Sequence, residues 1–522
     1  MKPNAGFLSL PEEIKLNILS FLSCRDILRC TSVCKTLRQA YISSSKHQYI
    51  VELSGQRLLH VPNTGDNVNI PVSKRLQLLR DKAHAWFKIN PNSFETVSLL
   101  KDIYFEETET FVVDGHIYSW DQAVDTATIV PILPQPSQKT VKRDWSPGTL
   151  FPVPNSRSIG VLMDPAQNLI VTAYGVFDDT LQSNHETICI DLKTLDNDNI
   201  HPKAAGPTLF LPLLPVSENH LEVTEDAKLK GIGRYIALGR SFVEEMWQLY
   251  IWDWQHSTTS NSVLMGTCFP QNPVDFCFLG NDRLLVVAEE LKLYSIEDMS
   301  QMPQLLARFS MPVTFSDARC FLPADHTEHS SPQTQAQQTM YTSDPQNRLL
   351  YILPEAAHVY IISTRIFFNL DGRAAAMPVP WECWGPSNTR IFAHGDECRI
   401  HVCGNRVLKA TLFGMLGGLS QFSLHMMDFS PLAVTNMRDV GRVVKEPSTI
   451  VIHSDDWDDG PVESLTTSLS YVHVVLDGRF VPSDSELVDV WVDHDRIYLL
   501  NRNLWNHEHY GIAHSELKVI DV

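Results

Sequence analysis

Short runs of β-branched and aromatic residues, separated by polar turns, fill the chain from about residue 100 onward. The runs at 159–163, 249–252 and 359–362 have the length of strands, and turn residues such as Asp164-Pro165 and Gly280-Asn281-Asp282 separate runs of this kind. No helical period is sustained over this region. The pattern predicts an all-β body.

A β-propeller suits such a long all-β region better than a sandwich does, because a propeller adds one four-stranded blade after another. At ~40–45 residues per blade plus long loops, six to eight blades fit residues 101–522, and seven is the preferred number. The aromatic residues Trp247, Tyr250, Trp252 and Trp254 are predicted to pack between blades, since Tyr250 and Trp252 share one face of a strand.

The first 50 residues have a helical pattern instead. Ser9 and Ser23 each precede an acidic residue by three positions, which predicts a capping box at the start of two helices. Three apolar stripes at helical spacing follow, and they consist of Ile14, Ile18, Phe21 and Leu22, then Ile27 and Leu28, then Val33, Leu37, Ala40 and Tyr41. A domain below ~40 residues usually needs outside help to close its core, so some of these faces are expected to pack on another protein.

Residues 73–89 predict one further amphipathic helix, with Leu76, Leu79, Ala83 and Trp86 as its apolar line. We interpret it as a strut. The chain is therefore divided into a helical head (residues 1–50), a helical linker (51–100) and a propeller-like body (101–522).

Charge is distributed unevenly between these parts. The chain has 42 Lys and Arg against 61 Asp and Glu, a net charge of −19, yet its first 50 residues carry +4. An acidic surface repels a phosphate backbone, so general nucleic-acid binding is not expected, and a basic protein target is favoured for the body.

The cysteines and the hydropathy pattern favour an intracellular protein. The ten cysteines contain no C-x-x-C pair, which favours reduced thiols in the cytoplasm or nucleus. No apolar run approaches the ~18 residues that a membrane span needs, so no membrane association is expected.

Motifs that would indicate an enzyme are weak. His507-Glu508-His509 with His514 lacks the spacing of a zinc peptidase motif, and Asp455–Gly460 lacks carboxylates at the positions that a calcium loop requires. We therefore predict no catalytic, cofactor-binding or metal-binding residues. A propeller hydrolase that uses the histidine-rich segment is kept as an alternative.

The head resembles the F-box family. The resemblance lies in Leu10-Pro11-Glu12-Glu13-Ile14, Ile18-Leu19-Ser20-Phe21-Leu22, Asp26-Ile27-Leu28 and Val33-Cys34-Lys35-Thr36-Leu37-Arg38, with Leu37 where many F-boxes carry Trp. The rest of the chain, Val379–Arg390 above all, resembles fungal F-box proteins with degenerate propeller-like C-terminal regions.

This resemblance implies a substrate-recruiting adaptor of a Skp–cullin–F-box ubiquitin ligase, which is not itself an enzyme. The head would dock on the Skp-type linker subunit, and through it on a cullin, while the body binds the target. An F-box scaffold that acts outside a ligase is a further alternative. The residues expected to contact the Skp-type subunit are Leu10, Pro11, Ile14, Ile18, Leu22, Ile27, Leu28, Val33, Cys34 and Leu37.

Overall fold

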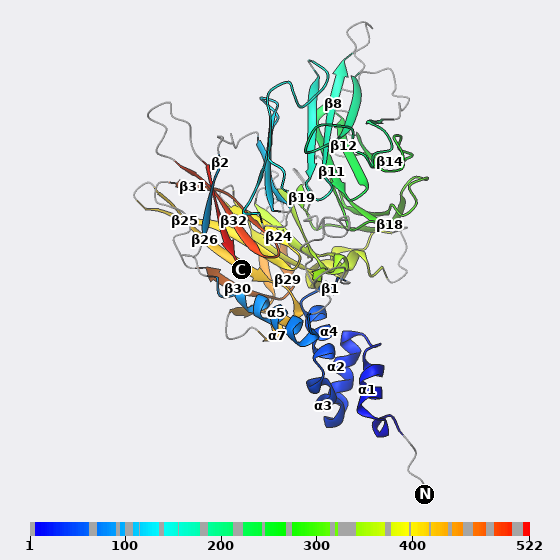
Figure 1. The fold of residues 1–522 in the computed structure, drawn as a ribbon, viewed down its shortest axis with the longest axis vertical. Coiled ribbons are helices and arrows are strands. Elements are labelled where there is room, and N and C mark those ends of the chain that lie inside the picture. Colours follow the sequence, from blue (N-terminus) through cyan, green and yellow to red (C-terminus); the bar gives the residue numbers. More distant parts are fainter. Residues whose placement is uncertain are drawn as a thin grey trace.

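The head is a cluster of short helices at one end of the molecule (Figure 1). A computed structural model describes the chain except residues 1–5, 62–69, 90–93, 100–107, 114, 135–139, 155, 178–185, 212–222, 243–245, 268–273, 314–318, 322–340, 356, 371–376, 396–397, 417–418, 437–440, 453–462, 477–484 and 504–514. The helical elements of the head are the 3₁₀ turn η1 (Phe7–Ser9) and the helices α1 (Glu12–Leu19), α2 (Cys24–Val33), α3 (Lys35–Ser43) and α4 (Ser45–Gly55). The three predicted helices are present, and α4 is a fourth helix that continues past the predicted end of the head.

Of the two serines predicted to cap helices, Ser23 does so. The Ser23 hydroxyl accepts a hydrogen bond from the Asp26 amide at 3.2 Å at the start of α2. The prediction for Ser9 is wrong, because Ser9 lies in η1 and its hydroxyl donates to the Gly6 carbonyl at 2.6 Å. Pro11 precedes α1 instead, and its fixed φ of −52° suits the start of a helix.

The predicted strut is the helix α5 (Val72–Ala85), and it connects the head to the propeller. Its N-terminal half packs with Tyr49 and Leu53 of α4, and its C-terminal end places Ala83, Trp86 and Phe87 in a core with the last two blades. The short strand β1 (Leu58–His60) pairs with β20 (Tyr341–Ser343) of the body. The head is therefore joined to the propeller by packed contacts.

The body is a seven-bladed β-propeller, as the sequence predicts. Its first four blades are consecutive antiparallel sheets of four strands each. Blade 1 comprises β3 (Thr108–Val113), β4 (His116–Asp121), β5 (Thr126–Pro131) and β6 (Arg143–Trp145), and blade 2 comprises β7 (Arg157–Asp164), β8 (Leu169–Phe177), β9 (Glu186–Thr194) and β10 (Thr208–Phe210). Blade 3 comprises β11 (Val223–Ile232), β12 (Tyr235–Phe242), β13 (Met246–Asp253) and β14 (Ser262–Thr267), and blade 4 comprises β15 (Asp275–Phe278), β16 (Arg283–Val287), β17 (Leu291–Ser295) and β18 (Gln304–Phe309).

The last three blades depart from simple repetition, and the seventh closes the ring. Blades 5 and 6 comprise β19 (Arg319–Phe321), β21 (Leu349–Glu355), β22 (His358–Ser363) and β23 (Thr389–Ala393), then β24 (Cys398–Cys403), β25 (Arg406–Leu416), β26 (Leu419–Asp428), β30 (Tyr471–Leu476) and β27 (Arg442–Val444). Blade 7 comprises β31 (Ser485–Val492), β32 (Arg496–Asn503), β33 (Ser515–Asp521) and, from the other end of the chain, β2 (Glu95–Leu99). Since β2 belongs to the propeller, the predicted end of the linker at residue 100 is too late.

Each pair of neighbouring blades shares an apolar core, and seven such cores complete the ring. Alternation along β13 shows how one strand serves two of them. Trp247 and Leu249 face blade 4, whereas Tyr250 and Trp252 face blade 2. The prediction that the aromatic cluster packs between blades is confirmed, since Trp254 is buried there as well.

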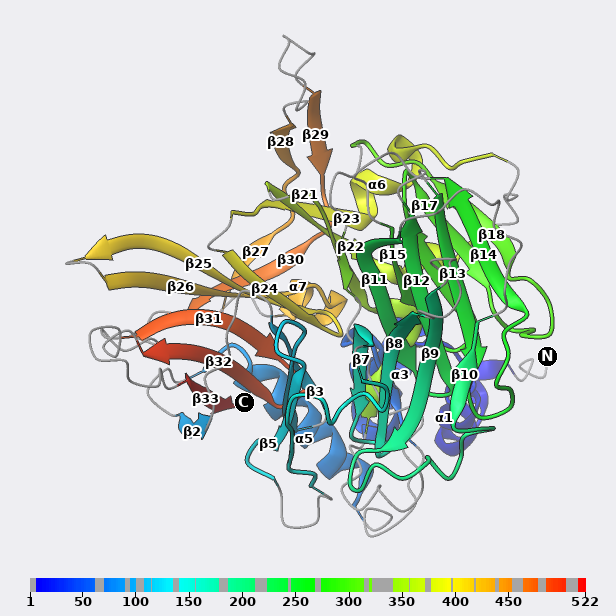
Figure 2. The same cartoon turned by 90° about the horizontal axis from the view of Figure 1, so that it is seen from above.

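Two short helices and a projecting hairpin were not predicted. The helices are α6 (Trp381–Asn388) and α7 (Pro431–Asn436). The hairpin of β28 (Ser448–Ile452) and β29 (Glu463–Thr467) extends from the body in a different direction from the long strands β25 and β26 (Figure 2). Two further 3₁₀ turns, Pro345–Asn347 and Thr364–Phe367, flank β21 and β22. The acidic segment 455–460 and the histidine-rich segment 507–514 lie outside the described residues.

Candidate partner-binding surface

The helices of the head expose a surplus of large apolar side chains. Among its described residues, eight such side chains are exposed, and they are Phe7, Leu8, Ile14, Ile18, Phe21, Leu28, Val33 and Ile42. Over residues 6–44, only Leu19, Ile27, Leu37 and Ala40 are buried apolar residues. We call the eight exposed residues the apolar face of the head.

Most of the predicted contact residues reach solvent. Ile14, Ile18, Leu28 and Val33 belong to the apolar face, and Val33 is 76% exposed. Pro11 is exposed, and the remaining accessible members, which are Leu10, Leu22 and Cys34, are half-buried.

Ile27 and Leu37 were expected to be exposed, and this expectation is wrong. Ile27 is 0% and Leu37 is 5% exposed, because both lie inside the small core that α1, α2 and α3 share. Their place in the sequence motif therefore reflects the folding of the head. Val33 lies at the end of α2 and not in α3, so its predicted place in the third stripe is also wrong.

The structure adds residues that the sequence analysis did not assign to the surface. Phe21 follows α1, and with 82% of its surface exposed it is the most exposed large apolar residue of the described chain. Phe7, Leu8 and Ile42 are exposed as well. Periodicity assigned Phe21 to a helix stripe, but α1 ends at Leu19, so Phe21 lies outside the helix.

Basic side chains accompany the apolar face. Arg25, Lys35 and Arg38 are exposed, and Arg29 forms an exposed pair with Asp26 at 3.4 Å. An exposed pair of this kind contributes little to stability, so the local charge remains available to an acidic partner.

A buried histidine, His47, links two helices of the head. The His47 imidazole is buried, with Nε2 2.9 Å from the Leu16 carbonyl and Nδ1 2.7 Å from the Ser44 hydroxyl. Burial lowers the pKa of His47, so the ring is neutral at physiological pH. This contact joins α4 to α1 and fixes the position of one helix against the other.

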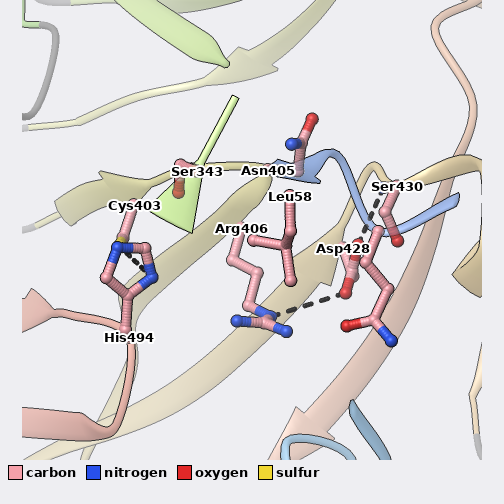
Figure 3. A pocket seen from close by; sticks show the side chains of 10 residues that line it. Leu58, Ser343, Cys403, Asn405, Arg406, Asp428, Ser430 and His494 are labelled. Atoms are coloured by element: carbon pink, nitrogen blue, oxygen red, sulfur yellow. Dashed lines mark hydrogen bonds and ion pairs between the residues drawn. The ribbon is translucent and has the colours of Figure 1, made fainter. Parts of the chain in front are cut away.

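A pocket lies where the head and linker meet blades 6 and 7 (Figure 3). Arg406 lies above the Trp86 ring at 4.6 Å and pairs with Asp428 at 3.5 Å. Cys403 Sγ is 4.0 Å from His494 Nδ1, but Cys403 is buried, so this pair packs the joint rather than presenting a nucleophile. Together these contacts fix the direction in which the head points.

Charged side chains also meet near the propeller axis. Lys230 Nζ is 2.6 Å from Asp275 Oδ1, and Asp275 Oδ2 accepts from the Cys320 amide at 2.7 Å. Burial acts to raise the pKa of Asp275, but Lys230 and Lys228 together hold it below its ordinary value. Each partner is satisfied within the protein, so the cluster joins blades 3, 4 and 5 and serves a structural purpose.

Within the described ranges, no three His, Cys, Asp or Glu side chains gather closely enough to hold a metal ion. None of the helices described has both the length and the apolar character that crossing a bilayer requires.

The geometry of the head agrees with a family comparison. The family model described as F-box-like matches residues 7–45. Residues 7–45 are an F-box-like domain. The combination of an F-box-like domain with a seven-bladed β-propeller fits an F-box substrate adaptor in general.

Comparisons of the whole chain give distant similarities. None of the curated proteins compared with this chain matches its sequence. The acylaminoacyl peptidase of Pyrococcus horikoshii is similar with a TM-score of 0.33 and 9% identity, over 78% of this chain and 49% of the peptidase, so this chain spans about half of that protein. The propeller domain of the trilobed protease from Pyrococcus furiosus is similar with a TM-score of 0.27 and 10% identity, over 70% of this chain and 93% of that domain. AztD from Citrobacter koseri is similar with a TM-score of 0.27 and 11% identity, over 61% of this chain and 68% of AztD.

Proposed function

We propose that this protein is a non-catalytic adaptor that recruits proteins to a Skp–cullin–F-box ubiquitin ligase. The observation that carries the proposal is the apolar face on an F-box-like domain at the end of the molecule remote from the blades (Figure 1). The F-box-like domain binds the Skp-type subunit and through it a cullin, and the propeller binds the recruited protein.

Burial of the apolar face supplies the driving force for docking. Burying one large apolar side chain that is otherwise exposed contributes roughly 1.5–3 kcal/mol, so a few residues of the face suffice for a stable complex. Phe21 and Val33 are the strongest candidates for this role because they are the most exposed members.

The basic residues around the face favour an acidic partner surface. Arg25, Lys35 and Arg38 would raise the rate of encounter with such a surface and fix its orientation, with an effect that weakens as salt increases. The acidic remainder of the chain favours a target that is basic overall. The nine described cysteines are free, which supports a role inside the cell.

The experiment is a reconstitution with a purified Skp-type subunit and cullin. We expect the full chain to co-elute with both, and we expect the double variant Phe21→Ser/Val33→Ser to bind the Skp-type subunit at least ~10-fold more weakly, since two hot-spot residues are removed. The matched control is Ile200→Ser, because Ile200 is an exposed aliphatic residue of the propeller.

Two results would count against this proposal. Equal binding by the wild type and the double variant would show that the apolar face is not the docking surface. Binding of the Skp-type subunit without recruitment of a cullin would indicate a scaffold outside a ligase.

A further inference from the structure

A row of basic side chains crosses four neighbouring strands of blade 6. The strands β25, β26, β30 and β27 follow one another in the sheet, and each contributes one member to the row: Lys409, His425, His473 and Arg442. We call these four residues the basic row. They are 64 residues or fewer apart in the sequence but have no recognisable spacing, so only the sheet brings them together.

The strand register places all four side chains on one face of the sheet. Lys409 lies opposite His425, and His473 lies opposite Arg442. His425 pairs with Val475, two positions from His473, so the two halves of the row are offset diagonally. Neighbouring strands lie ~4.8 Å apart, which gives the row a length of about 14 Å.

The two imidazoles at the centre of the row interact directly. His425 Nδ1 is 3.0 Å from His473 Nε2, and the rings are stacked with centroids 5.2 Å apart. Burial lowers the pKa of both imidazoles. His473 and Lys409 lower the pKa of His425 further, and Arg442 and Lys409 lower that of His473 further. Both rings are half-buried, so a ligand in solvent can reach them.

The charged groups around the row are predominantly positive. Lys409 donates to the Ala393 carbonyl at 2.8 Å and lies above the Phe392 ring, while Arg390 of blade 5 donates to the Glu446 carbonyl at 3.0 Å. Glu446 is the nearby carboxylate, and it is exposed beyond the end of β27 next to Lys445. Its own amide and that of Lys445, and then Arg442 and Arg390, lower the pKa of Glu446, so it is ionised and offsets part of this charge.

We propose that the basic row binds a short acidic segment of a partner protein, with the segment's carboxylates accepting from Arg442, Lys409 and the two imidazoles. A row of about 14 Å is long enough for two or three carboxylates of an extended peptide, whose successive same-side residues lie ~7 Å apart. In the setting of the proposed function this segment belongs to the recruited protein, although its binding does not require the head.

Two other ligands fit the row less well. A divalent metal ion held by the two imidazoles would face Lys409 and Arg442, which repel it. A nucleic acid would extend beyond the row over the surface of a chain that carries a net charge of −19. The basic row is therefore a small positive region on an acidic protein. Because salt at physiological concentration screens charges beyond ~8 Å, the row attracts only a short acidic ligand.

The test uses the full chain and a fluorescent hexaglutamate peptide, with hexaglutamine as the uncharged comparison. We expect hexaglutamate to bind and hexaglutamine not to bind. Arg442→Gln and Lys409→Gln should each weaken hexaglutamate binding by about tenfold, since each removes a hydrogen bond to a charged group. The matched control is Lys203→Gln, which removes an exposed cation from blade 2 and should leave the affinity unchanged.

A pH series tests the part played by the imidazoles. A bound carboxylate favours the protonated rings, so hexaglutamate affinity should rise as the pH falls from about 8 to about 6. The double variant His425→Asn/His473→Asn should abolish this dependence. Circular dichroism confirms that each variant is folded.

Several outcomes would overturn the proposal. These are the absence of hexaglutamate binding, binding that Arg442→Gln and Lys409→Gln leave unchanged, binding of a six-nucleotide oligothymidylate as tight as that of hexaglutamate, and zinc binding that His425→Asn/His473→Asn abolishes. Because Phe21→Ser/Val33→Ser should still bind hexaglutamate, failure of the basic row is distinguishable from failure of docking by the head.

Discussion

The head and the propeller treat their apolar residues in opposite ways. Eight large apolar side chains are exposed among residues 7–42, and the same number are exposed among the described residues of 95–522. In the propeller, neighbouring blades bury such residues in seven shared cores, whereas the helices of the head bury four and leave twice that number in solvent. The propeller buries its apolar residues between its own blades, whereas the head leaves most of them in solvent, as the proposed docking on another protein requires.

The largest effect that tests this comparison is the loss of a blade-to-blade contact. Trp252 is fully buried between blades 2 and 3, so Trp252→Ala should lower the free energy of unfolding by ~3–5 kcal/mol. Urea denaturation followed by circular dichroism measures this change. Phe21→Ala is the matched change in the head, and it should stay within ~0.5 kcal/mol because nothing in the free protein covers Phe21.

The buried ion pair of the propeller should give the next largest effect on stability. Lys230→Met removes the nearer of the two ammonium groups that face the buried Asp275 and leaves only Lys228, at 3.8 Å, so it should cost about 3 kcal/mol of unfolding free energy in the same denaturation experiment. A cost below ~1 kcal/mol would contradict the structural purpose assigned to this cluster.

The buried and the exposed apolar residues of the head should differ in their contribution to the free energy of unfolding. Ile27→Ala opens the small core of the head and should cost ~2 kcal/mol or more, whereas Ile14→Ala, at a position 47% exposed, should cost little. Hydrogen exchange of the α2 amides measures the difference locally. Similar exchange in both variants would mean that Ile27 does not support the head.

Acid should weaken the propeller through a histidine at the contact between blades 6 and 7. Burial lowers the pKa of His401 to about 3, and its Nδ1 accepts from the Val492 amide at 3.3 Å. The unfolded chain binds a proton at its ordinary pKa near 6.5 while the folded chain does not, so stability present above pH ~6.5 is lost as the pH falls towards 3. Denaturation midpoints measured over this range should fall less steeply in His401→Gln.

The smallest effect is expected for the exposed ion pair of the head. Arg29 and Asp26 lie 3.4 Å apart, but both side chains are about half exposed or more, so Arg29→Ala should change the unfolding free energy by less than ~0.5 kcal/mol. Thermal denaturation checks this value, and a larger loss would give the pair a structural role.

Local patterns predicted the regular parts of the molecule. Alternation along runs such as 249–252 identified strands with two apolar faces, which is what a blade between two neighbours requires. The stripe of Leu76, Leu79, Ala83 and Trp86 likewise identified α5, and all four residues are buried.

Features that depend on distant contacts were not predictable. The strand β2 is completed by β33 at the far end of the chain, and no local signal specifies that pairing. In α6, Gly385 and Pro386 disfavour a helix, yet Trp381 packs so closely that a Cβ at Gly385 would lie 2.2 Å from its ring. Tertiary packing outweighs local propensity there.

The candidate surface was predictable in outline but not residue by residue. The motif located the head, but Ile27 and Ile14 look alike in a helical stripe, and only the packing of α1 and α2 against α3 decides which one is buried. The basic row lay beyond any local pattern, since its members come from four different strands.

The most direct test of the account is calorimetric titration of the full chain with a purified Skp-type subunit at several temperatures. Burial of the apolar face predicts a complex of one to one with a negative heat-capacity change, and Phe21→Ser/Val33→Ser should make that change markedly smaller. A heat-capacity change that the double variant leaves unaltered, or no binding by the wild type, would contradict the claim that the head is completed by this partner.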